Sequence, residues 1–165
     1  MKIYTAKPFS KEKYQLGEGP FYDSRTKTLS WVDITEGKFY TLSGDGKKTE
    51  YAIGQEIGAA LPTEKKDTYL IAGTDGLYLL DTTTESPSPK LIKDLRPYFE
   101  SFQRSNDAKA DPKGRLWLGS SVKDNHEPCG NLFCLDPFNQ GEITCRQPDT
   151  KISNGMAWSR DHKRF

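Results

Sequence analysis

Short runs of alternating apolar and polar residues follow one another along this 165-residue chain, and turns containing glycine or aspartate separate them. Runs of this length, rich in β-branched and aromatic residues, predict β-strands. We predict strands at residues 27–34, 38–42, 48–53, 68–72, 77–81, 115–121, 131–136 and 142–146. Residues 94–103 have room for one helical turn, which Pro97 disfavours. The pattern therefore indicates an all-β protein.

The pattern repeats. Four similar segments begin near Glu18, Gly58, Asn106 and Asn154. Each runs through a short apolar stretch to a turn, and the four turns begin at Asp23, Thr63, Asp111 and Ser159. A period of about 40 to 50 residues built from roughly four short strands is typical of one blade of a β-propeller.

The repeats divide the chain into blades at residues 14–54, 55–93 and 104–148, with the first strand of a fourth blade in 152–165. Propellers close into a ring of about four to eight blades, so that each blade covers its neighbour. Three blades and one strand leave open faces and an unpaired edge. We therefore expect residues 1–165 to be the N-terminal part of a single propeller domain, completed by a longer chain or by a partner.

Composition narrows the class of protein. The net charge of +1 comes without a basic face, which disfavours nucleic acid as a partner. No apolar run approaches the ~20 residues of a membrane span, and the first residues lack the apolar stretch of a signal peptide, so we expect a cytoplasmic protein without a membrane partner. The three cysteines, Cys129, Cys134 and Cys145, lack paired spacing, so we expect reduced thiols rather than a zinc site or disulfides.

Polar residues recur at one position of the repeat. Alignment on the turns places Glu18, Gly58, Asn106 and Asn154 at equivalent places before the innermost strand of each blade. Equivalent positions converge around the axis of a radial array, and carboxylate and carboxamide oxygens are ligands for a hard divalent cation. Each segment taken singly also fits an ordinary turn or a solvated loop. The residues alone leave both interpretations open.

Longer segments carry a family resemblance. They are residues 16–20, 31–34, 104–119 and 152–159. In this order and spacing they resemble the family of senescence marker protein 30 (regucalcin), gluconolactonases and luciferin-regenerating enzymes. The resemblance implies a six-bladed β-propeller with one divalent metal ion in its central channel. It favours calcium, with zinc, magnesium and manganese as alternatives. The activity it implies is metal-dependent hydrolysis of a sugar lactone.

The resemblance also assigns roles to residues. Glu18 and Asn154 match two metal ligands of the family. The third ligand, an aspartate that is also the proposed general base, is expected beyond Phe165, so no catalytic base is assigned in this chain. Arg104 and Asn106 match substrate-binding residues. Asp124 matches an acidic substrate-binding position that is glutamate in regucalcin.

Smaller expectations concern residues around these. Asp107 is expected to brace the loop of Asn106, and His126 either borders the site or is exposed. We expect Trp31, Trp117 and Trp158 to pack between blades.

Three functions compete. The first is a lactonase that is inactive and poorly folded without the further blades. The second is a calcium-binding regulatory protein of regucalcin type with little catalysis. The third is a propeller scaffold for protein partners, which has no need of polar residues converging at one repeat position.

Overall fold

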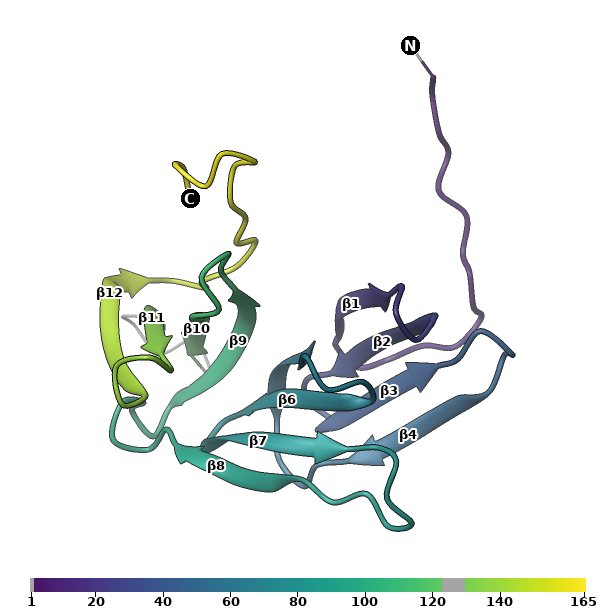
Figure 1. Cartoon of the computed structure of the whole chain (residues 1–165), viewed down its shortest axis with the longest axis horizontal. Coiled ribbons are helices and arrows are strands. Elements are labelled where there is room, and N and C mark those ends of the chain that lie inside the picture. The colour runs from purple at the N-terminus through teal and green to yellow at the C-terminus, as the bar shows by residue number, and fades with distance from the viewer. Residues whose placement is uncertain (1, 123–129) are drawn as a thin grey trace.

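The computed structural model describes residues 2–122 and 130–165, and this part of the chain is all-β. Its strands form three four-stranded antiparallel sheets (Figure 1). The first sheet contains β1 (Gly17–Asp23), β2 (Thr28–Asp33), β3 (Lys38–Leu42) and β4 (Lys48–Ala52). The second contains β5 (Ile57–Pro62), β6 (Thr68–Gly73), β7 (Gly76–Asp81) and β8 (Lys90–Asp94). The third contains β9 (Gln103–Ala110), β10 (Leu116–Val122), β11 (Gly130–Asp136) and β12 (Glu142–Thr150).

Each sheet is a simple meander in which every strand pairs with the next strand of the chain. This confirms the all-β class and the four-stranded repeat. The strand β8 was not expected from the sequence. After β8, Leu95 is fully buried. Its carbonyl accepts a hydrogen bond from the Phe99 amide at 3.1 Å. This bond closes one turn within residues 94–103, where the sequence left room for a single helical turn. The described residues include no helix with the length and apolarity that crossing a membrane requires.

Two hydrophobic cores lie between the sheets. The first joins the first and second sheets, and its largest fully buried side chains are Phe39, Ile71 and Leu80. The second joins the second and third sheets around Leu77 and Phe133. Because burial of one large apolar side chain contributes about 1.5–3 kcal/mol, these two cores hold the three sheets together.

None of the three tryptophans belongs to either of these two cores. In β2, Val32 points into the first core, so its neighbour Trp31 points to the opposite face, where it stacks on Tyr40. Trp117 of the third sheet contacts Trp158 and Phe165 of the fourth repeat, with ring centres 6.3 and 4.7 Å away, as expected for a residue that packs between repeats. The expected packing of Trp31 between blades stays a prediction.

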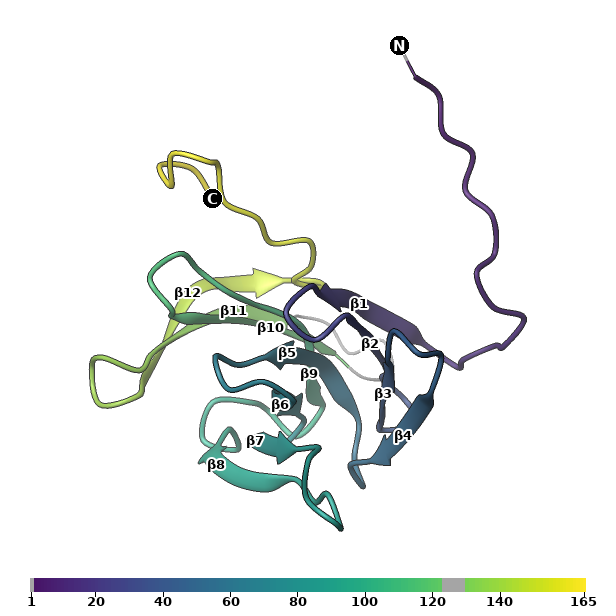
Figure 2. The ribbon, with the colours of Figure 1, turned by 45° about the vertical axis from the view of Figure 1, so that its right-hand side comes forward.

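The innermost strands β1, β5 and β9 lie side by side, with β5 in the middle (Figure 2). The hydroxyl of Ser105, which is 1% exposed, links β9 to the second sheet. Its oxygen accepts a hydrogen bond from the Gly58 amide at 2.9 Å and donates one to the Ala72 carbonyl at 2.7 Å. The ends of these three strands are thereby fixed relative to one another.

The described structure assigns no strand to residues 153–165, so the expected first strand of a fourth blade, in residues 152–165, stays a prediction. Only an isolated bridge from Ile152 to Ser121 extends the third sheet. The turn at Ser159 forms, with the His162 amide 2.8 Å from the Ser159 carbonyl (Figure 1). After it, the Phe165 ring packs on Trp117 of the third sheet, with the ring centres 4.7 Å apart. A strand requires a neighbour with a free edge, and among the described residues 153–165 have none.

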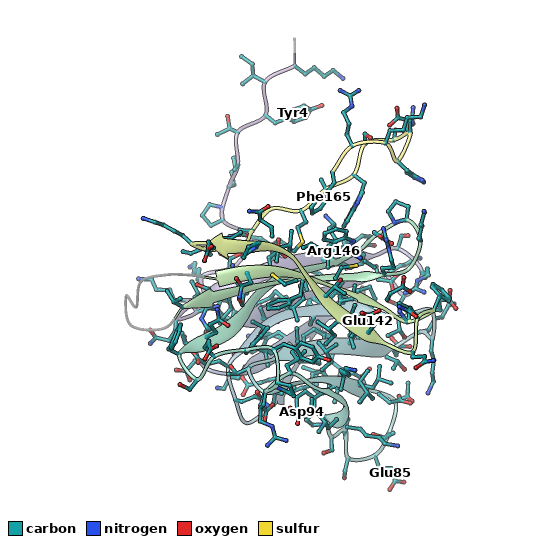
Figure 3. All side chains as sticks on the ribbon, turned by 90° about the vertical axis from the view of Figure 1, so that its left-hand side faces the viewer. Tyr4, Glu85, Asp94, Glu142, Arg146 and Phe165 are labelled. Carbon is teal, nitrogen blue, oxygen red and sulfur yellow. The ribbon has the colours of Figure 1, made fainter. Side chains whose placement is uncertain are left out.

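The N-terminal residues form an extended arm. Tyr4 is 85% exposed and lies clear of the sheets (Figure 3). The arm reaches the body at Gln15 and Leu16, whose amides donate to the buried carboxylate of Asp33 at 2.8 and 3.0 Å. Asp33 thus fixes the entry of the chain into β1, immediately before Glu18.

Candidate functional site

Each innermost strand is interrupted at the same position of the repeat. The register of β1 shifts between Glu18 and Phe21, and that of β5 shifts at Gly58. The register of β9 shifts across Asn106 and Asp107, which lie between the paired residues Ser105 and Ala108. Bulges re-aim side chains and are common beside active sites. The polar repeat position found in the sequence is therefore a bulge position.

In β5 this position has no room for a side chain. A Cβ atom on Gly58 would lie 2.2 Å from the carbonyl oxygen of Asn106 and 2.5 Å from its amide nitrogen. Both obstructing atoms are backbone, so neither can move aside cheaply. The second repeat therefore contributes a close backbone contact rather than a ligand.

In β9 the bulge presents two consecutive polar side chains to the same space. The Asn106 amide group donates to the Ser153 carbonyl at 3.1 Å, and the Asp107 carboxylate accepts from the Gly155 amide at 2.8 Å. Arg104 donates through Nη1 to the Asn106 side-chain oxygen at 2.9 Å and to the Ser105 carbonyl at the same distance. Asn106 therefore connects the arginine to the segment that carries Asn154.

These groups line a cavity of about 350 Å³ between β1, β9 and the segment around Ile152. Its polar lining residues are Glu18, Arg104, Asn106, Asp107 and Asn154. The structure thus brings together four of the five residues singled out in the sequence. The fifth, Asp124, lies outside the described residues, as do His126 and Cys129.

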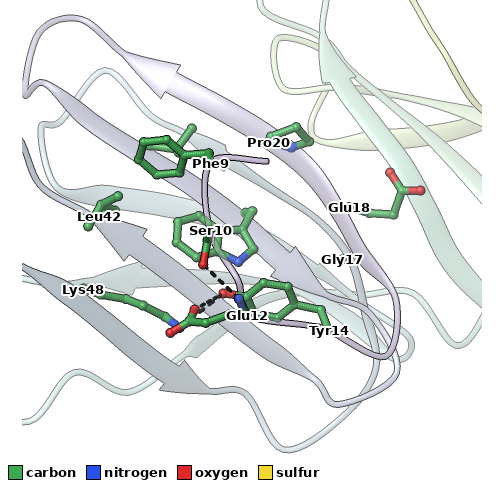
Figure 4. Close-up of a pocket in the computed structure, with 11 residues that line it drawn as sticks. Phe9, Ser10, Glu12, Tyr14, Gly17, Glu18, Pro20, Leu42 and Lys48 are labelled. Carbon is green, nitrogen blue, oxygen red and sulfur yellow. Dashed lines mark hydrogen bonds and ion pairs between the residues drawn. The ribbon is translucent and has the colours of Figure 1, made fainter. Parts of the chain in front are cut away.

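Glu18 and Asn154 are the cavity residues with uncommitted oxygens. Both are exposed, and neither side chain forms a hydrogen bond with another described residue. Figure 4 shows the Glu18 carboxylate directed away from Tyr14 and Lys48. A carboxylate and a carboxamide oxygen facing one cavity fit a hard divalent cation, which takes about six to eight oxygen ligands. The described residues contain no group of three or more His, Cys, Asp or Glu arranged to hold a metal ion. Glu18 and Asn154 would therefore be only part of its shell.

Arg104 supplies positive charge at the cavity wall. Partial burial lowers the pKa of its guanidinium, and the negative charge of Glu56 opposes that shift. An arginine remains protonated at physiological pH despite such a shift. The two hydrogen bonds from Nη1 fix the orientation of the guanidinium group. Its other two nitrogens can then donate to a ligand.

A larger cavity, of about 480 Å³, lies on the outer face of the first sheet beneath the N-terminal arm (Figure 4). Two of its charged groups satisfy each other, because Lys48 forms an ion pair with Glu12 and lies 4.9 Å from the centre of the Tyr40 ring. Glu18 lines both cavities, and its carboxylate is directed away from this pair. The rest of its lining is largely apolar. The smaller cavity is therefore the better candidate site, because its polar groups converge and two of them are free.

Sequence reasoning missed the roles of Ser105 and Ser153. They occupy equivalent positions, each just before the polar residue of its repeat. Ser153 donates to the Asn131 carbonyl at 3.2 Å and shares a hydrogen bond with Thr150 at 2.6 Å. The signal was the recurrence of Ser-Asn at Ser105-Asn106 and Ser153-Asn154.

Comparison with known proteins identifies the family. The family described as SMP-30/Gluconolactonase/LRE-like region matches residues 16–165 of this chain by sequence. The chain belongs to this family. Family membership confirms the resemblance seen in the sequence.

Relatives in the SMP-30/gluconolactonase family are similar over nearly the whole chain. A pentonolactonase of Haloferax volcanii is 30% identical over 92% of this chain and 48% of its own length. The solved structure of a luciferin-regenerating enzyme is 28% identical with a TM-score of 0.79, and the match covers 92% of this chain and 51% of that one. A calcium-binding protein, regucalcin, of Agrobacterium tumefaciens is 28% identical with a TM-score of 0.73, over 85% of this chain and 45% of that one. The chain spans about half the length of the relatives it matches.

Proposed function

We propose that the protein is a divalent-metal-dependent sugar lactonase whose active site includes the cavity between β1 and β9. The observation that carries the proposal is the convergence of Glu18, Arg104 and Asn154 on one cavity from separate repeats. We further propose that the three sheets belong to a six-bladed propeller whose other blades complete the metal shell and supply the general base. Residues 1–165 alone would then lack activity.

Each residue has a defined part. Glu18 and Asn154 would hold the metal ion, with calcium favoured by their oxygen ligands and zinc, magnesium or manganese as alternatives. When bound, such an ion polarises a carbonyl oxygen as a Lewis acid. Arg104 binds the lactone through charge-assisted hydrogen bonds from its free nitrogens to substrate oxygens. Asn106 holds Arg104 in place, because its side-chain oxygen accepts from Nη1.

Hydrolysis opens the ring by addition of water. The acyl carbon gains the water oxygen, the ring carbon–oxygen bond breaks, and the product is a hydroxy acid. At neutral pH the acid ionises and releases one proton per turnover. Proton release therefore measures the reaction directly, without a coloured substrate.

The test is a pH-stat assay of the full-length protein with aldonolactones and each candidate metal. We expect chelation to abolish activity and Glu18→Gln to reduce kcat/KM by about 100-fold or more, since loss of even an outer-shell partner of a metal site costs about 10–100-fold. Glu85→Gln is the matched control, because Glu85 lies on an exposed loop (Figure 3) and does not line the cavity. Absence of turnover with every lactone and metal would refute the proposal.

The second candidate function is calcium binding in a regulatory role. The calcium-binding regucalcin among the solved relatives favours it. Under this alternative, calorimetry of the full-length protein shows calcium binding that Glu18→Gln abolishes, while the pH-stat shows no turnover. The same pair of proteins therefore separates the two functions.

A further inference from the structure

We infer that Asp107 is a positioning residue that sets the place of Asn154 in the cavity. The inference rests on the proposed function, because it assumes that Asn154 binds the metal ion. It assigns Asp107 no contact with metal or substrate. Its part is to hold the backbone that carries the ligand.

The segment from Ser153 to Gly155 lies outside the sheets. Among the described residues, its only ladder contact is the bridge at the preceding residue, Ile152. Its place against β9 is instead fixed by side chains on either side of Asn154. Asn106 donates to the Ser153 carbonyl, and Asp107 accepts from the Gly155 amide.

The bulge in β9 allows both side chains to form hydrogen bonds with this segment. In a regular strand, consecutive side chains point to opposite faces of the sheet. Here Asn106 and Asp107 together oppose Gly119, so both reach the same segment. Gly119 itself leaves the space that the segment occupies, because a Cβ atom there would lie 2.5 Å from the Cβ of Ser153.

The conformation of Gly155 shows what Asp107 stabilises. Gly155 has φ of +72°, in the left-handed region that favours glycine. Its amide is directed to a carboxylate, and hydrogen bonds to ionised acceptors are about twice as strong as neutral ones. Without Asp107, the amide loses this acceptor and glycine is free to adopt other conformations. The Asn154 side chain would then leave its position in the cavity.

The test compares Asp107→Ala, Asp107→Asn and wild type in the full-length protein. Asparagine keeps an oxygen that can accept from the Gly155 amide but carries no charge. We expect calcium affinity, measured by calorimetry, to fall about 10–100-fold in Asp107→Ala and about threefold or less in Asp107→Asn. Excess metal should restore kcat in the alanine variant. Asp161→Ala is the control, because Asp161 caps a turn on the same segment, where it accepts from Ser159, and does not line the cavity.

Amide hydrogen exchange of the metal-free proteins gives an independent readout. Exchange at Gly155 should be faster in Asp107→Ala than in wild type, with the rate in Asp107→Asn close to wild type and the sheets unchanged. An equal loss of affinity in both variants would overturn the inference, because it would make Asp107 a charged ligand. Unchanged exchange at Gly155 would also overturn it. If wild type binds no metal and opens no lactone, the proposed function fails, while the exchange data still decide whether Asp107 holds the segment.

Discussion

Gly58 and Asn106 occupy the same repeat position on neighbouring strands, yet they serve opposite purposes. Gly58 is buried where the backbone of β9 presses against β5, and it has no space for a side chain. Asn106 lies at the cavity and contacts both Arg104 and Ser153. One repeat position therefore provides close packing in one sheet and polar chemistry in the next.

The surroundings of the two sheets explain the difference. The second sheet contributes to both hydrophobic cores, so its two faces are covered. Its innermost strand β5 lies between β1 and β9 and borders the cavity only at Gly58, whereas those two strands present polar side chains to it. A repeat protein can thus vary its site by changing how closely neighbouring repeats approach. The variants below test this comparison, beginning with the largest expected effect.

Gly58→Ala should be the most damaging change. The new Cβ would overlap backbone atoms of Asn106 and Ser105, which can be relieved only by separating β5 from β9. We expect a loss of about 3 kcal/mol in the free energy of unfolding, the upper part of the range for overpacking. Urea denaturation measures it. Gly44→Ala is the control, because the nearest atoms to a Cβ there lie 3.4 Å away. Equal stability of the two variants would contradict the close contact.

Ser105→Ala removes the link between the same two strands without adding volume. The Gly58 amide loses the acceptor 2.9 Å away in a fully buried place. An unsatisfied buried donor costs about 1–3 kcal/mol, so we expect a loss of about 2 kcal/mol by urea denaturation. Ser88→Ala, on an exposed loop, should change stability by less than about 0.5 kcal/mol. A neutral Ser105→Ala would show that close packing alone holds β5 against β9.

Much of this fold follows from the sequence, because strands and turns are local. The repeat and its turns were predicted from the alternation of residues and from positions such as Asp23 and Asp111. The strand β8 was missed, because Lys90 and Lys93 flank its two apolar residues and obscure the alternation. The expected first strand of a fourth blade is not formed among the described residues, since a strand depends on a neighbour that local pattern does not supply. Pairing between strands is a property of the whole structure.

The sequence predicted which residues form the site, but not the backbone geometry that places them there. Superposition of the repeats placed Glu18, Asn106 and Asn154 together, and all three line the cavity. The bulges were not foreseen, because a register shift depends on which residues face one another across two strands. Gly58 was recognised as the odd member of the set, but only the position of β9 explains why it must be glycine.

The second and third repeats also differ at the turn position, where Thr63 corresponds to Asp111. Burial raises the pKa of Asp111, but the Arg115 amide, the Trp117 indole and the Arg115 guanidinium outweigh it, so the pKa lies below its ordinary value. The Thr63 hydroxyl does not ionise in the acid range, and it donates to the Lys65 carbonyl at 3.0 Å. Of these two turn positions, only that of the third repeat should therefore make the fold sensitive to acid.

The sign of this pH dependence follows from linkage. A carboxyl group whose pKa is lowered by folding stabilises the protein above its unfolded pKa of about 3.9, and that stability is lost as the pH falls through the folded pKa. Asp111→Asn should lower the free energy of unfolding by about 1.5 kcal/mol at pH 7 and reduce the further loss between pH 5 and pH 2. Thermal melts across this range measure both effects, with Thr63→Ser as the control. An Asp111→Asn protein as acid-sensitive as wild type would place the titrating group elsewhere.

Glu18→Ala should have the smallest effect on the fold, although Glu18 shares the repeat position of Gly58. Its carboxylate is exposed and makes no hydrogen bond to the described residues, so its removal should change stability by less than about 0.5 kcal/mol without metal. Calcium at 100 times its dissociation constant should stabilise full-length wild type by about 2.7 kcal/mol, because it binds only the folded state. That increment should vanish in Glu18→Ala and persist in Glu85→Ala. A large loss of stability in metal-free Glu18→Ala would mean that this position holds the fold, as Gly58 does, instead of being reserved for a ligand.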